Sequence, residues 1–350
     1  MQFFHISHTD MDGYTCQLIS KKVFPQGYFL NANYGLEVKL YIQEVLNKIS
    51  ECDKSEEILF LITDLNLTTD ESKNLNNDIN KLNEDGYNIT LQLLDHHATG
   101  SKSAKRYDWY YLDTSRSATK ITYEYFKEHY NETLCQNCEP NFEKLVQAVN
   151  AADIWLDDDP LFEYGKVCMS MVSKSYEVNN TIFPNDHRAY KHFLLTCALN
   201  FIEEKDGYIK LDEKIYFYKK EFLNQKQSNN TLDNLTSDYL VKLLDTKKEE
   251  LTVHYKQYKG LLTYALGNIS ISANGFLRAN EEYDFFMDVG RRGRVGFRSN
   301  NKLDVSILAQ KLAGGGGHPN ASGASFDDFK ESPLYEDIKR YIQDKLDKCE

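Results

Sequence analysis

Three short apolar runs near the start of the chain each end at acidic or imidazole side chains. The side chains that follow them are His8, Asp10 and Asp12 after residues 2–7, Asp64 after residues 57–63, and Asp95, His96 and His97 after residues 88–94. Amphipathic stretches separate the runs, which is typical of strand–helix units around a parallel sheet. Because open parallel sheets bind ligands at the carboxyl ends of their strands, we expect these side chains to gather at one sheet edge.

The expected fold class is α/β with two domains, since 350 residues exceed the length at which a single core usually splits. We expect an N-terminal doubly wound, mostly parallel sheet domain that a helical linker joins to a smaller α/β C-terminal domain. The predicted boundaries are 1–200 for the first domain, including a helical extension from about 160, then 201–258 for the linker and 259–350 for the second domain.

The spacing of apolar residues predicts the individual elements. Strands are expected near residues 2–7, 28–33, 57–63 and 88–94, and helices near 13–24, 35–50, 69–85, 115–130 and 141–156. The fourth of these helices has Thr114 or Ser115 as its expected cap. Further helices are expected near 188–200, 211–225 and 236–257, and strand-like alternation returns at 260–267, 283–290 and 295–299.

Composition limits the class of protein. Hydrophobic residues make up 41% of the chain and aromatic residues 13%, and no stretch reaches the roughly 20 apolar residues of a membrane span. The first residues show no basic segment followed by an apolar one, so we expect a cytoplasmic protein without membrane association. Seven cysteines fit reduced thiols, and we expect the only close pair, Cys135 and Cys138, in a plain loop rather than a metal or redox site.

The formal net charge of −12 bears on the partners of the protein. A protein that holds long nucleic acids needs a basic track to displace counterions from phosphates, and no chain-wide track occurs in this sequence. The one basic cluster comprises Arg291, Arg292, Arg294 and Arg298. It fits either a solvated hairpin or a small phosphate clamp, since arginine suits bidentate phosphate contacts. The charge therefore disfavours long nucleic acids as partners.

The acidic and imidazole residues together predict a metal site. Asp153 joins them from the helical stretch 142–155, where neighbouring alanines let a backbone approach a crowded centre; a capping or solvent-facing role is the alternative. The predicted ligands are His8, Asp10, Asp12, Asp64, His96 and Asp153. Four carboxylates balance two divalent cations, with Asp64 as the bridging ligand. Mixed oxygen and nitrogen ligands favour two Mn²⁺ ions, with Co²⁺, Mg²⁺ or zinc as substitutes.

Such a pair of cations, about 3.5 to 4 Å apart, can hold a bridging hydroxide for in-line attack on a phosphate, which makes Asp64 a catalytic residue as well as a ligand. Asp95 suits the support of a ligating histidine through its second ring nitrogen. His97 suits contact with the substrate phosphate or the leaving oxygen. A structural histidine pair in a turn is the alternative, but it does not explain the matching strand end at Asp64. His5, by contrast, is expected to pack inside its strand.

A glycine-rich segment marks the C-terminal region. Residues 314–323 contain four successive glycines followed by His318, after a helical stretch at 304–313. Glycine lets backbone amides approach phosphate oxygens, and an imidazole at the end of such a loop can donate to one. We therefore expect a loop pressed against a ligand, with a flexible linker as the alternative.

The middle third of the chain offers no chemistry that the sequence reveals. Its histidines, which lack ligand spacing, are His187, His192 and His254. A polar bend is expected at 224–230. A homodimer interface is one use that stays open for this part of the chain.

Together these motifs resemble the DHH phosphoesterase superfamily. The match consists of His-x-Asp-x-Asp-Gly, a lone Asp, Asp-His-His, a second lone Asp and Gly-Gly-Gly-His-x-x-Ala-x-Gly, over residues 1–155 and about 259–326. The resemblance implies a two-domain enzyme with a manganese pair in the first domain, a DHH-associated substrate-binding second domain, and a reaction in the cleft between them. By motif position, it implies one metal ion on His8, Asp10 and Asp64 and a second on Asp12, Asp64, His96 and Asp153.

Within the superfamily, the pattern around Asp10 is similar to the bacterial nano-RNase branch, which trims very short RNAs. Several branches place the first histidine four residues before the Asp-x-Asp pair, whereas His8 precedes Asp10 by two. The Ser-Arg-Lys motif of manganese-dependent pyrophosphatases is missing, which disfavours that activity. The predicted substrate-binding residues are Arg116, Arg298, Ser299, Gly315, Gly316, Gly317 and His318, of which Arg298 and His318 match substrate contacts of the family.

The leading hypothesis is a manganese-dependent phosphodiesterase, a 3′-5′ oligoribonuclease that releases mononucleotides from dinucleotides to about pentamers. Nucleotide bisphosphates such as 3′-phosphoadenosine 5′-phosphate, linear dinucleotides derived from cyclic messengers, and cyclic mononucleotides stay open as substrates. A single-strand DNA exonuclease would need stacking aromatics beside a basic channel. A nucleotide-sensing regulator that binds without cleaving would be marked by loss of a ligand carboxylate, and none is lost.

Overall fold

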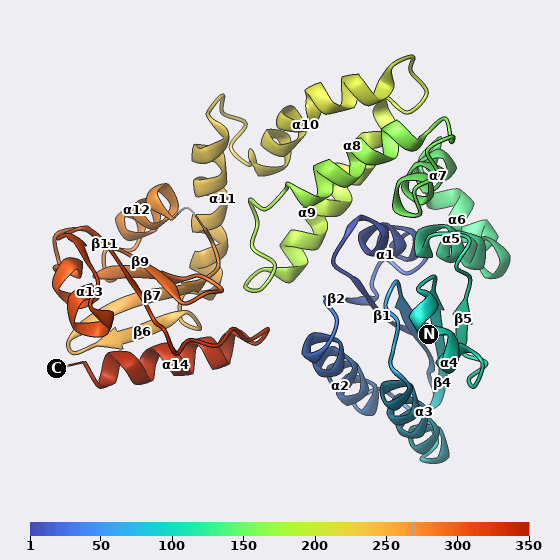
Figure 1. Cartoon of the computed structure of the whole chain (residues 1–350), viewed down its shortest axis with the longest axis horizontal. Coiled ribbons are helices and arrows are strands. Elements are labelled where there is room, and N and C mark those ends of the chain that lie inside the picture. The colour runs from blue at the N-terminus through green and yellow to red at the C-terminus, as the bar shows by residue number, and fades with distance from the viewer. Residues whose placement is uncertain (268, 350) are drawn as a thin grey trace. The chain divides into compact units, whose positions relative to one another are not determined.

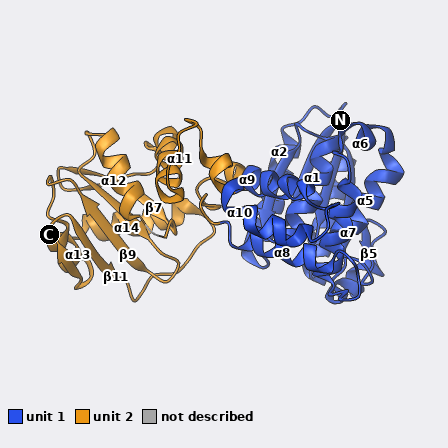
Figure 2. Ribbon diagram, turned by 90° about the horizontal axis from the view of Figure 1, so that it is seen from above, with its two compact units in different colours: residues 1–175, 188–218 blue, residues 176–187, 219–350 orange. Residues whose placement is uncertain are grey.

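The computed structural model describes residues 1–267 and 269–349. The chain divides into two compact units, unit 1 with residues 1–175 and 188–218, and unit 2 with residues 176–187 and 219–350 (Figure 2). Each unit has its own sheet, which confirms the expected α/β class. The units are defined by packing, and the predicted functional boundaries of 1–200, 201–258 and 259–350 stay a prediction.

Unit 1 is built on a five-stranded sheet with the order β2-β1-β3-β4-β5 (Figure 1). Its strands are β1 (Gln2–His8), β2 (Tyr28–Ala32), β3 (Glu57–Thr63), β4 (Asn88–Asp95) and β5 (Tyr110–Leu112). All neighbouring pairs are parallel, so the carboxyl ends lie at one edge. The four predicted strands are confirmed, and β5, with three residues, is too short for its pattern to be read.

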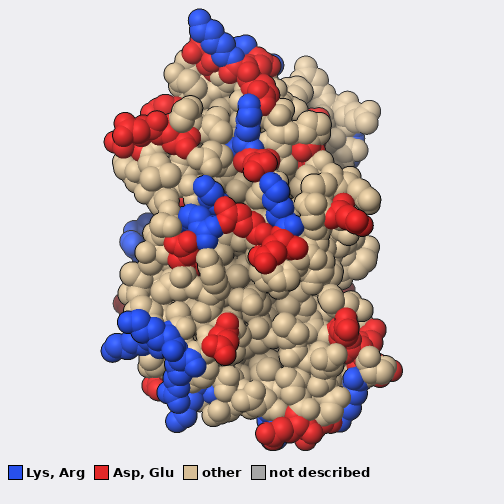
Figure 3. Space-filling model, turned by 90° about the vertical axis from the view of Figure 1, so that its right-hand side faces the viewer, with Lys and Arg blue, Asp and Glu red and all other residues tan. Residues whose placement is uncertain are grey.

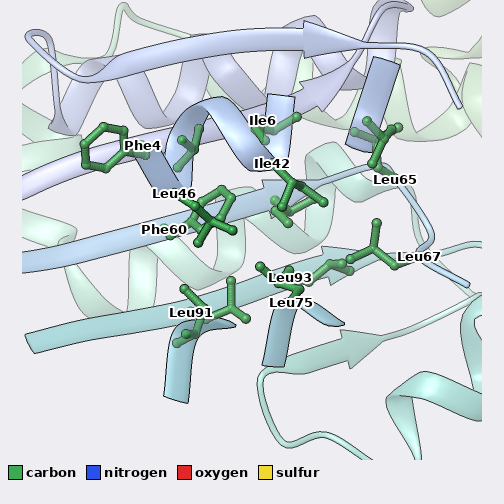
Figure 4. Close-up of a cluster of buried hydrophobic side chains, with 14 of the residues drawn as sticks. Phe4, Ile6, Ile42, Leu46, Phe60, Leu65, Leu67, Leu75, Leu91 and Leu93 are labelled. Atoms are coloured by element: carbon green, nitrogen blue, oxygen red, sulfur yellow. The ribbon is translucent and has the colours of Figure 1, made fainter. Parts of the chain in front are cut away.

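Helices cover both faces of this sheet, as the doubly wound prediction requires (Figure 1). One face packs against α2 (Leu36–Ser50) and α3 (Thr69–Glu84), and the other against α1 (Met11–Val23) and α5 (Ala118–His129). The cluster under the first pair, drawn in Figure 4, includes Phe4, Ile6, Phe60, Leu91 and Leu93 from strands and Ile42, Leu46 and Leu75 from helices. Burial of each such side chain contributes about 1.5–3 kcal/mol and keeps the strand ends in place.

The remaining elements of the first 223 residues are helical. They are η1 (Ala98–Gly100), α4 (Ser101–Ala104), α6 (Asn131–Asn137), α7 (Phe142–Asp153), α8 (Phe162–Ser173), α9 (Pro184–Cys197), η2 (Ala198–Asn200) and α10 (Gly207–Leu223). The helices predicted near 141–156, 188–200 and 211–225 are therefore confirmed as α7, α9 and α10, and the expected bend at 224–230 contains neither helix nor strand.

Unit 2 contains a six-stranded mixed sheet with the order β10-β11-β9-β8-β7-β6. Its strands are β6 (Thr252–Tyr255), β7 (Tyr258–Tyr264), β8 (Phe285–Val289), β9 (Arg294–Ser299), β10 (Gly316–His318) and β11 (Ala321–Ser325). Its helices are α11 (Leu232–Lys247), α12 (Ser270–Ala279), α13 (Val305–Ala313) and α14 (Tyr335–Asp347). Strands β7 and β8 are parallel, and the other pairs are antiparallel.

Two predicted boundaries need correction. The cap of α5 is Ser117, whose hydroxyl accepts from the backbone of Lys120, whereas Ser115 bonds to Asp113. The helix expected over 236–257 ends at Lys247, because the following residues alternate between buried and exposed positions and pair with β7 as strand β6.

The glycine-rich segment also differs from the expected loop. Residues Gly316–His318 form β10, which pairs with β11 in an antiparallel hairpin. Gly317 has a φ of 148°, and a Cβ there would lie 2.6 Å from the carbonyl oxygen of Ala321. Glycine is therefore required at this position for the close approach of the two strands.

No described helix is long and apolar enough to cross a membrane. On the face of the molecule drawn in Figure 3, lysine and arginine side chains occur in small groups mixed with aspartate and glutamate, and the described residues there form no continuous basic track.

Candidate metal centre

The carboxyl edge of the unit 1 sheet brings the predicted ligands together. His8 is the last residue of β1, Asp64 directly follows β3, and His96 directly follows β4. Since β1 pairs with β3 and β3 with β4, these three side chains come from adjacent strands although they lie dozens of residues apart in sequence. The convergence expected from the apolar runs is present.

Two more carboxylates lie on the turn into α1. Asp10 is the N-cap of this helix, and its Oδ1 accepts from the backbone N–H of Gly13 at 3.0 Å. A Cβ at Gly13 would lie 2.4 Å from the carbonyl oxygen of His8, so glycine is needed for the first turn of the helix to pack against β1. The Asp-x-Asp-Gly motif thus places Asp10 and Asp12 beside the strand end.

Asp12 is held from a distant part of the chain. Its carboxylate is buried and accepts two backbone hydrogen bonds of 2.8 Å, from Ala118 and Thr119 at the start of α5. The positive end of a helix dipole favours a carboxylate at this place. These bonds fix the orientation of Asp12 over more than a hundred residues of sequence separation.

Asp64 and Asp153 each have a buried carboxylate oxygen. Asp64 has a left-handed backbone with φ 57°, and Asp153 is the last residue of α7. Within the described residues, Asp64 Oδ2 and Asp153 Oδ2 have no hydrogen-bond partner. Burial, together with the charges of Asp12 and Asp10, raises the pKa of both carboxyl groups. Buried carboxylates without donors are costly unless a metal or a proton compensates them, so these residues fit divalent cations.

Three overlapping groups of side chains have ligand atoms within 4.8 Å of one another. They are His8, Asp10 and Asp64; Asp12, His96 and Asp153; and Asp64, His96 and His97. In the first group, His8 Nδ1 lies 2.8 Å from Asp10 Oδ2 and 3.7 Å from Asp64 Oδ2. His96 Nε2 lies 3.3 Å from Asp64 Oδ1 and 3.6 Å from Asp153 Oδ2. Asp64 and His96 each belong to two groups, and of the two only the carboxylate of Asp64 has a separate oxygen for each of two cations.

The raised pKa of His8 also indicates that the clustered carboxylates attract positive charge. Burial opposes its protonation, but hydrogen bonds and charges from Asp10 and Asp64 outweigh this effect and raise the pKa of His8 to about 10. A proton on His8 therefore supplies part of the positive charge that the carboxylates demand. A bound cation would take over that role and leave the imidazole neutral.

Asp95 holds His97 rather than His96. His97 Nδ1 lies 2.7 Å from Asp95 Oδ1, and the other carboxylate oxygen accepts from the Tyr110 hydroxyl at 2.9 Å. The Asp95 side chain is fully buried, and that of His97 is 35% exposed. This pair fixes the ring of His97, so Nε2 is the ring nitrogen that Asp95 leaves available.

The sequence analysis missed Tyr34. This residue follows β2 at the same sheet edge, its ring centroid lies 5.2 Å from that of His8, and its hydroxyl lies 3.4 Å from His97 Nε2. Burial, with the nearby charges of Asp64 and Asp95, raises the pKa of the Tyr34 phenol, so it stays a hydrogen-bond donor. Its position just after an apolar run is the signal that could have revealed it.

His5 packs inside β1 as expected, but with polar partners. Its Nδ1 lies 2.8 Å from Ser20 Oγ and its Nε2 lies 2.8 Å from Thr63 Oγ1. Burial, and then the charge of Arg188, lowers the pKa of His5 to about 3. The neutral ring therefore links α1 to the end of β3, one residue before Asp64.

The predicted substrate residues of unit 2 lie on its sheet. Arg298 on β9 pairs with Ala321, which in turn pairs with His318 on β10, and Gly316 and His318 are exposed. One Arg298 nitrogen donates to Ser270 Oγ at 2.8 Å. The Ser299 hydroxyl is buried and donates to the carbonyl of Asp284. A Cβ at Gly315 would lie 2.2 Å from the carbonyl oxygen of Gly323, so this glycine serves close packing.

Arg116 lies in unit 1, two residues before Ala118, which donates to Asp12. Its guanidinium is engaged by Asp113, Glu124 and the Tyr111 hydroxyl. It lines a hollow of about 330 Å³ with residues of β4, β5 and α5. Ser299 and Arg116 would have to give up these partners to contact a substrate, and their predicted role stays a prediction.

Comparisons with known proteins agree with the motifs. The model of the DHHA1 domain matches residues 247–348. The 3′,5′-cyclic-nucleotide phosphodiesterase of Helicobacter pylori (strain ATCC 700392 / 26695) is 42% identical over 344 residues, 98% of each chain. Oligoribonuclease NrnB of Bacillus subtilis (strain 168) is 24% identical over 333 residues, 92% of this chain and 72% of the relative. The crystal structure of an uncharacterized protein from Helicobacter pylori G27 has a TM-score of 0.86 and 42% identity over 99% of both chains.

Proposed function

The chain belongs to the DHH phosphoesterase superfamily and is a phosphodiesterase of that family, and on this premise we propose that it hydrolyses 3′,5′-phosphodiester bonds of small nucleotides with two Mn²⁺ ions. The observation that carries the proposal is that Asp64 belongs to two ligand groups, one with His8 and Asp10 and one with His96. Overlapping groups suit two cations that share a ligand, and mixed carboxylate and imidazole ligands suit Mn²⁺. The predicted Co²⁺ or Mg²⁺ stay as substitutes.

The residues divide into two ligand sets. His8, Asp10 and Asp64 would hold one cation, and Asp12, Asp64, His96 and Asp153 the other. When bound, the cations supply an activated water nucleophile and a positive clamp for the phosphate. The chain itself orients this set, since α5 fixes Asp12 and the turn at Asp64 aims a buried carboxylate into the centre.

His97 acts on the substrate rather than on a cation in this proposal. Asp95 holds its Nδ1, so Nε2 is the nitrogen that can contact the phosphate or the leaving oxygen. Arg298, His318 and the exposed Gly316 of unit 2 are proposed as substrate contacts. A guanidinium and free backbone amides suit phosphate oxygens.

The full-length relative from Helicobacter pylori supports 3′,5′-cyclic mononucleotides as substrates. The same bond occurs in dinucleotides and nano-RNA, and the Bacillus relative together with the nano-RNase pattern around Asp10 supports these as a second substrate class. The net charge of −12 weighs against long strands in either case.

A substrate panel tests the proposal. Purified protein with Mn²⁺ is incubated with 3′,5′-cyclic mononucleotides, di-, penta- and decanucleotides, and 3′-phosphoadenosine 5′-phosphate, and the products are separated by chromatography. We expect mononucleotides from the cyclic substrates and the dinucleotides, and slower release from decanucleotides. Intact substrates throughout, or faster cleavage of long strands, would contradict the proposal.

A further inference from the structure

Tyr34 is an exposed aromatic residue at the edge of the metal centre. It lies between β2 and α2, and 45% of it is exposed. Its ring centroid lies 5.2 Å from that of His8 and 6.1 Å from that of His97. A tyrosine half open to solvent beside two imidazoles of the centre is within reach of any substrate that the centre holds.

The loop that carries Tyr34 is fastened to the ligand-bearing loop. The Thr9 hydroxyl, between His8 and Asp10, donates to the Asn33 side-chain oxygen at 2.7 Å. The backbone and side-chain N–H groups of Asn33 donate to Glu37 Oε2 at 2.6 and 2.8 Å. Gly35, with φ 87°, then turns the chain into α2. These bonds keep the phenol in place, so its exposure reflects position rather than a loose loop.

The hydroxyl of Tyr34 lies beside the one ring nitrogen of His97 that Asp95 leaves open. Tyr34 Oη is 3.4 Å from His97 Nε2, while His97 Nδ1 is bonded to Asp95. A substrate oxygen that contacts His97 Nε2 therefore comes within hydrogen-bond reach of the phenol. His97 also has a ring nitrogen within 4.8 Å of ligand atoms of Asp64 and His96, so Tyr34 and His97 adjoin the metal centre together.

Resting on the proposed function, we propose that Tyr34 is a catalytic residue that donates a hydrogen bond to the leaving oxygen of the phosphodiester. The cations would contact the other phosphate oxygens. The leaving oxygen, near His97 Nε2, would then be available to a neutral donor. A ribose alkoxide gains much from such a bond, because negative charge develops on it as the P–O bond breaks. This role also predicts which substrates depend on Tyr34. Cleavage of esters whose leaving groups are stable anions should depend less on the Tyr34 hydroxyl.

The test compares two leaving groups in one active site. Tyr34→Phe removes only the hydroxyl. With a 3′,5′-cyclic mononucleotide we expect kcat to fall roughly ten- to hundredfold and KM to change little. With the p-nitrophenyl ester of a nucleoside 5′-monophosphate, we expect the same variant to lose only a small part of this factor, because p-nitrophenolate leaves without help.

The controls separate this inference from the proposed function. Tyr216→Phe alters a tyrosine of α10 that is 56% exposed and should match the wild type on both substrates. Mn²⁺ titration and the thermal midpoint report whether the Tyr34 variants keep the centre and the fold, and Tyr34→Leu should repeat the leaving-group difference. If the Tyr34 variants lost kcat equally on both substrates, or lost none, the proposed role of Tyr34 would be wrong. Activity of the wild type on the cyclic nucleotide would still support the proposed function. A wild type inactive on all nucleotides would instead overturn the proposed function.

Discussion

At the carboxyl edge of the unit 1 sheet, buried carboxylates lie close together, and within the described residues Asp64 Oδ2 and Asp153 Oδ2 have no hydrogen-bond donor. Unit 2 also buries a carboxylate, Asp288, which is 6% exposed. One of its oxygens accepts from the Thr263 hydroxyl at 2.8 Å and from the backbone of Leu266 at 3.1 Å. Of these carboxylates, Asp288 is satisfied by protein donors and supports the fold, whereas Asp64 and Asp153 each have an oxygen that lacks such a donor among the described residues and fit a cation site.

The polar residues around Arg298 extend the comparison. Arg298 bonds to Ser270 and to a backbone carbonyl, and His318 lies exposed on β10. Nothing in this cluster is buried at a cost that a ligand must offset. In the proposed function, unit 2 therefore supplies adaptable contacts for a substrate, whereas the buried carboxylates of unit 1 form the candidate metal site.

The largest effect is expected from Asp64→Asn. Loss of the shared carboxylate should lower kcat on the order of a thousandfold or more and weaken Mn²⁺ binding. The matched control is Asp288→Asn, a buried carboxylate in unit 2, which should retain activity and Mn²⁺ affinity. Steady-state kinetics and Mn²⁺ titration of both variants measure kcat and Mn²⁺ affinity. If both variants lost activity and affinity equally, Asp64 would differ in no way from a carboxylate that only supports the fold.

The second prediction concerns stability in the presence of a chelator. The pKa values of Asp64 and Asp153 are raised above the ordinary 3.8, so the folded protein binds more protons than the unfolded chain over the range above that value. The contribution of these two carboxyl groups to the free energy of unfolding therefore falls as the pH rises from acid toward neutral. His5, whose pKa is lowered from 6.5 to about 3, contributes in the opposite direction between these two values, so the carboxyl contribution is measured as the difference between the wild type and Asp153→Asn. At 100 times its Kd, Mn²⁺ should restore about 2.7 kcal/mol.

Thermal melts at several pH values, with chelator and with Mn²⁺, check this prediction. Asp153→Asn removes one of the charges, so it should raise the melting midpoint in chelator and reduce the gain from Mn²⁺. A midpoint in chelator that rises with pH would show that these carboxylates are compensated by other groups.

A smaller effect is expected at unit 2. Arg298→Ala and His318→Ala should each raise KM by about tenfold, equivalent to about 1.4 kcal/mol of substrate binding. The stabilisation by Mn²⁺ should stay as in the wild type, because neither side chain belongs to a ligand group. Steady-state kinetics measure KM, and thermal melts with Mn²⁺ measure the stabilisation by the ion. If Arg298→Ala abolished the stabilisation by Mn²⁺, the proposed division between substrate binding in unit 2 and metal binding in unit 1 would be wrong.

The smallest effect on catalysis is expected behind the metal centre. His5 has partners at both ring nitrogens, like the satisfied polar groups of unit 2. His5→Phe should lower the free energy of unfolding by about 1–3 kcal/mol, because Ser20 and Thr63 lose a buried partner. Denaturant unfolding measures the loss, and kcat should stay close to the wild-type value. A kcat loss as large as that of Asp64→Asn would place His5 in the catalytic machinery.

The local patterns of the sequence were sufficient for four of the five strands of unit 1 and for the candidate ligands that lie at their ends. The apolar runs of β1, β3 and β4, which are mostly buried, became strands, and the end of each carries an acidic or imidazole residue. The parallel arrangement then required these ends to meet, because all carboxyl ends of a parallel sheet lie at one edge. The boundary errors, such as the cap at Ser117 and strand β6, arose where short polar stretches fit more than one structure.

Only the tertiary structure decided how the site is completed. Asp12 is oriented by backbone donors of Ala118 and Thr119, Asp95 bonds to His97 rather than His96, and Tyr34 lies beside His97 from another strand end. These contacts join residues that no local periodicity relates, and they depend on the turn at each strand end. The sequence determined which side chains reach the edge, and packing between distant segments determined which atoms face one another there.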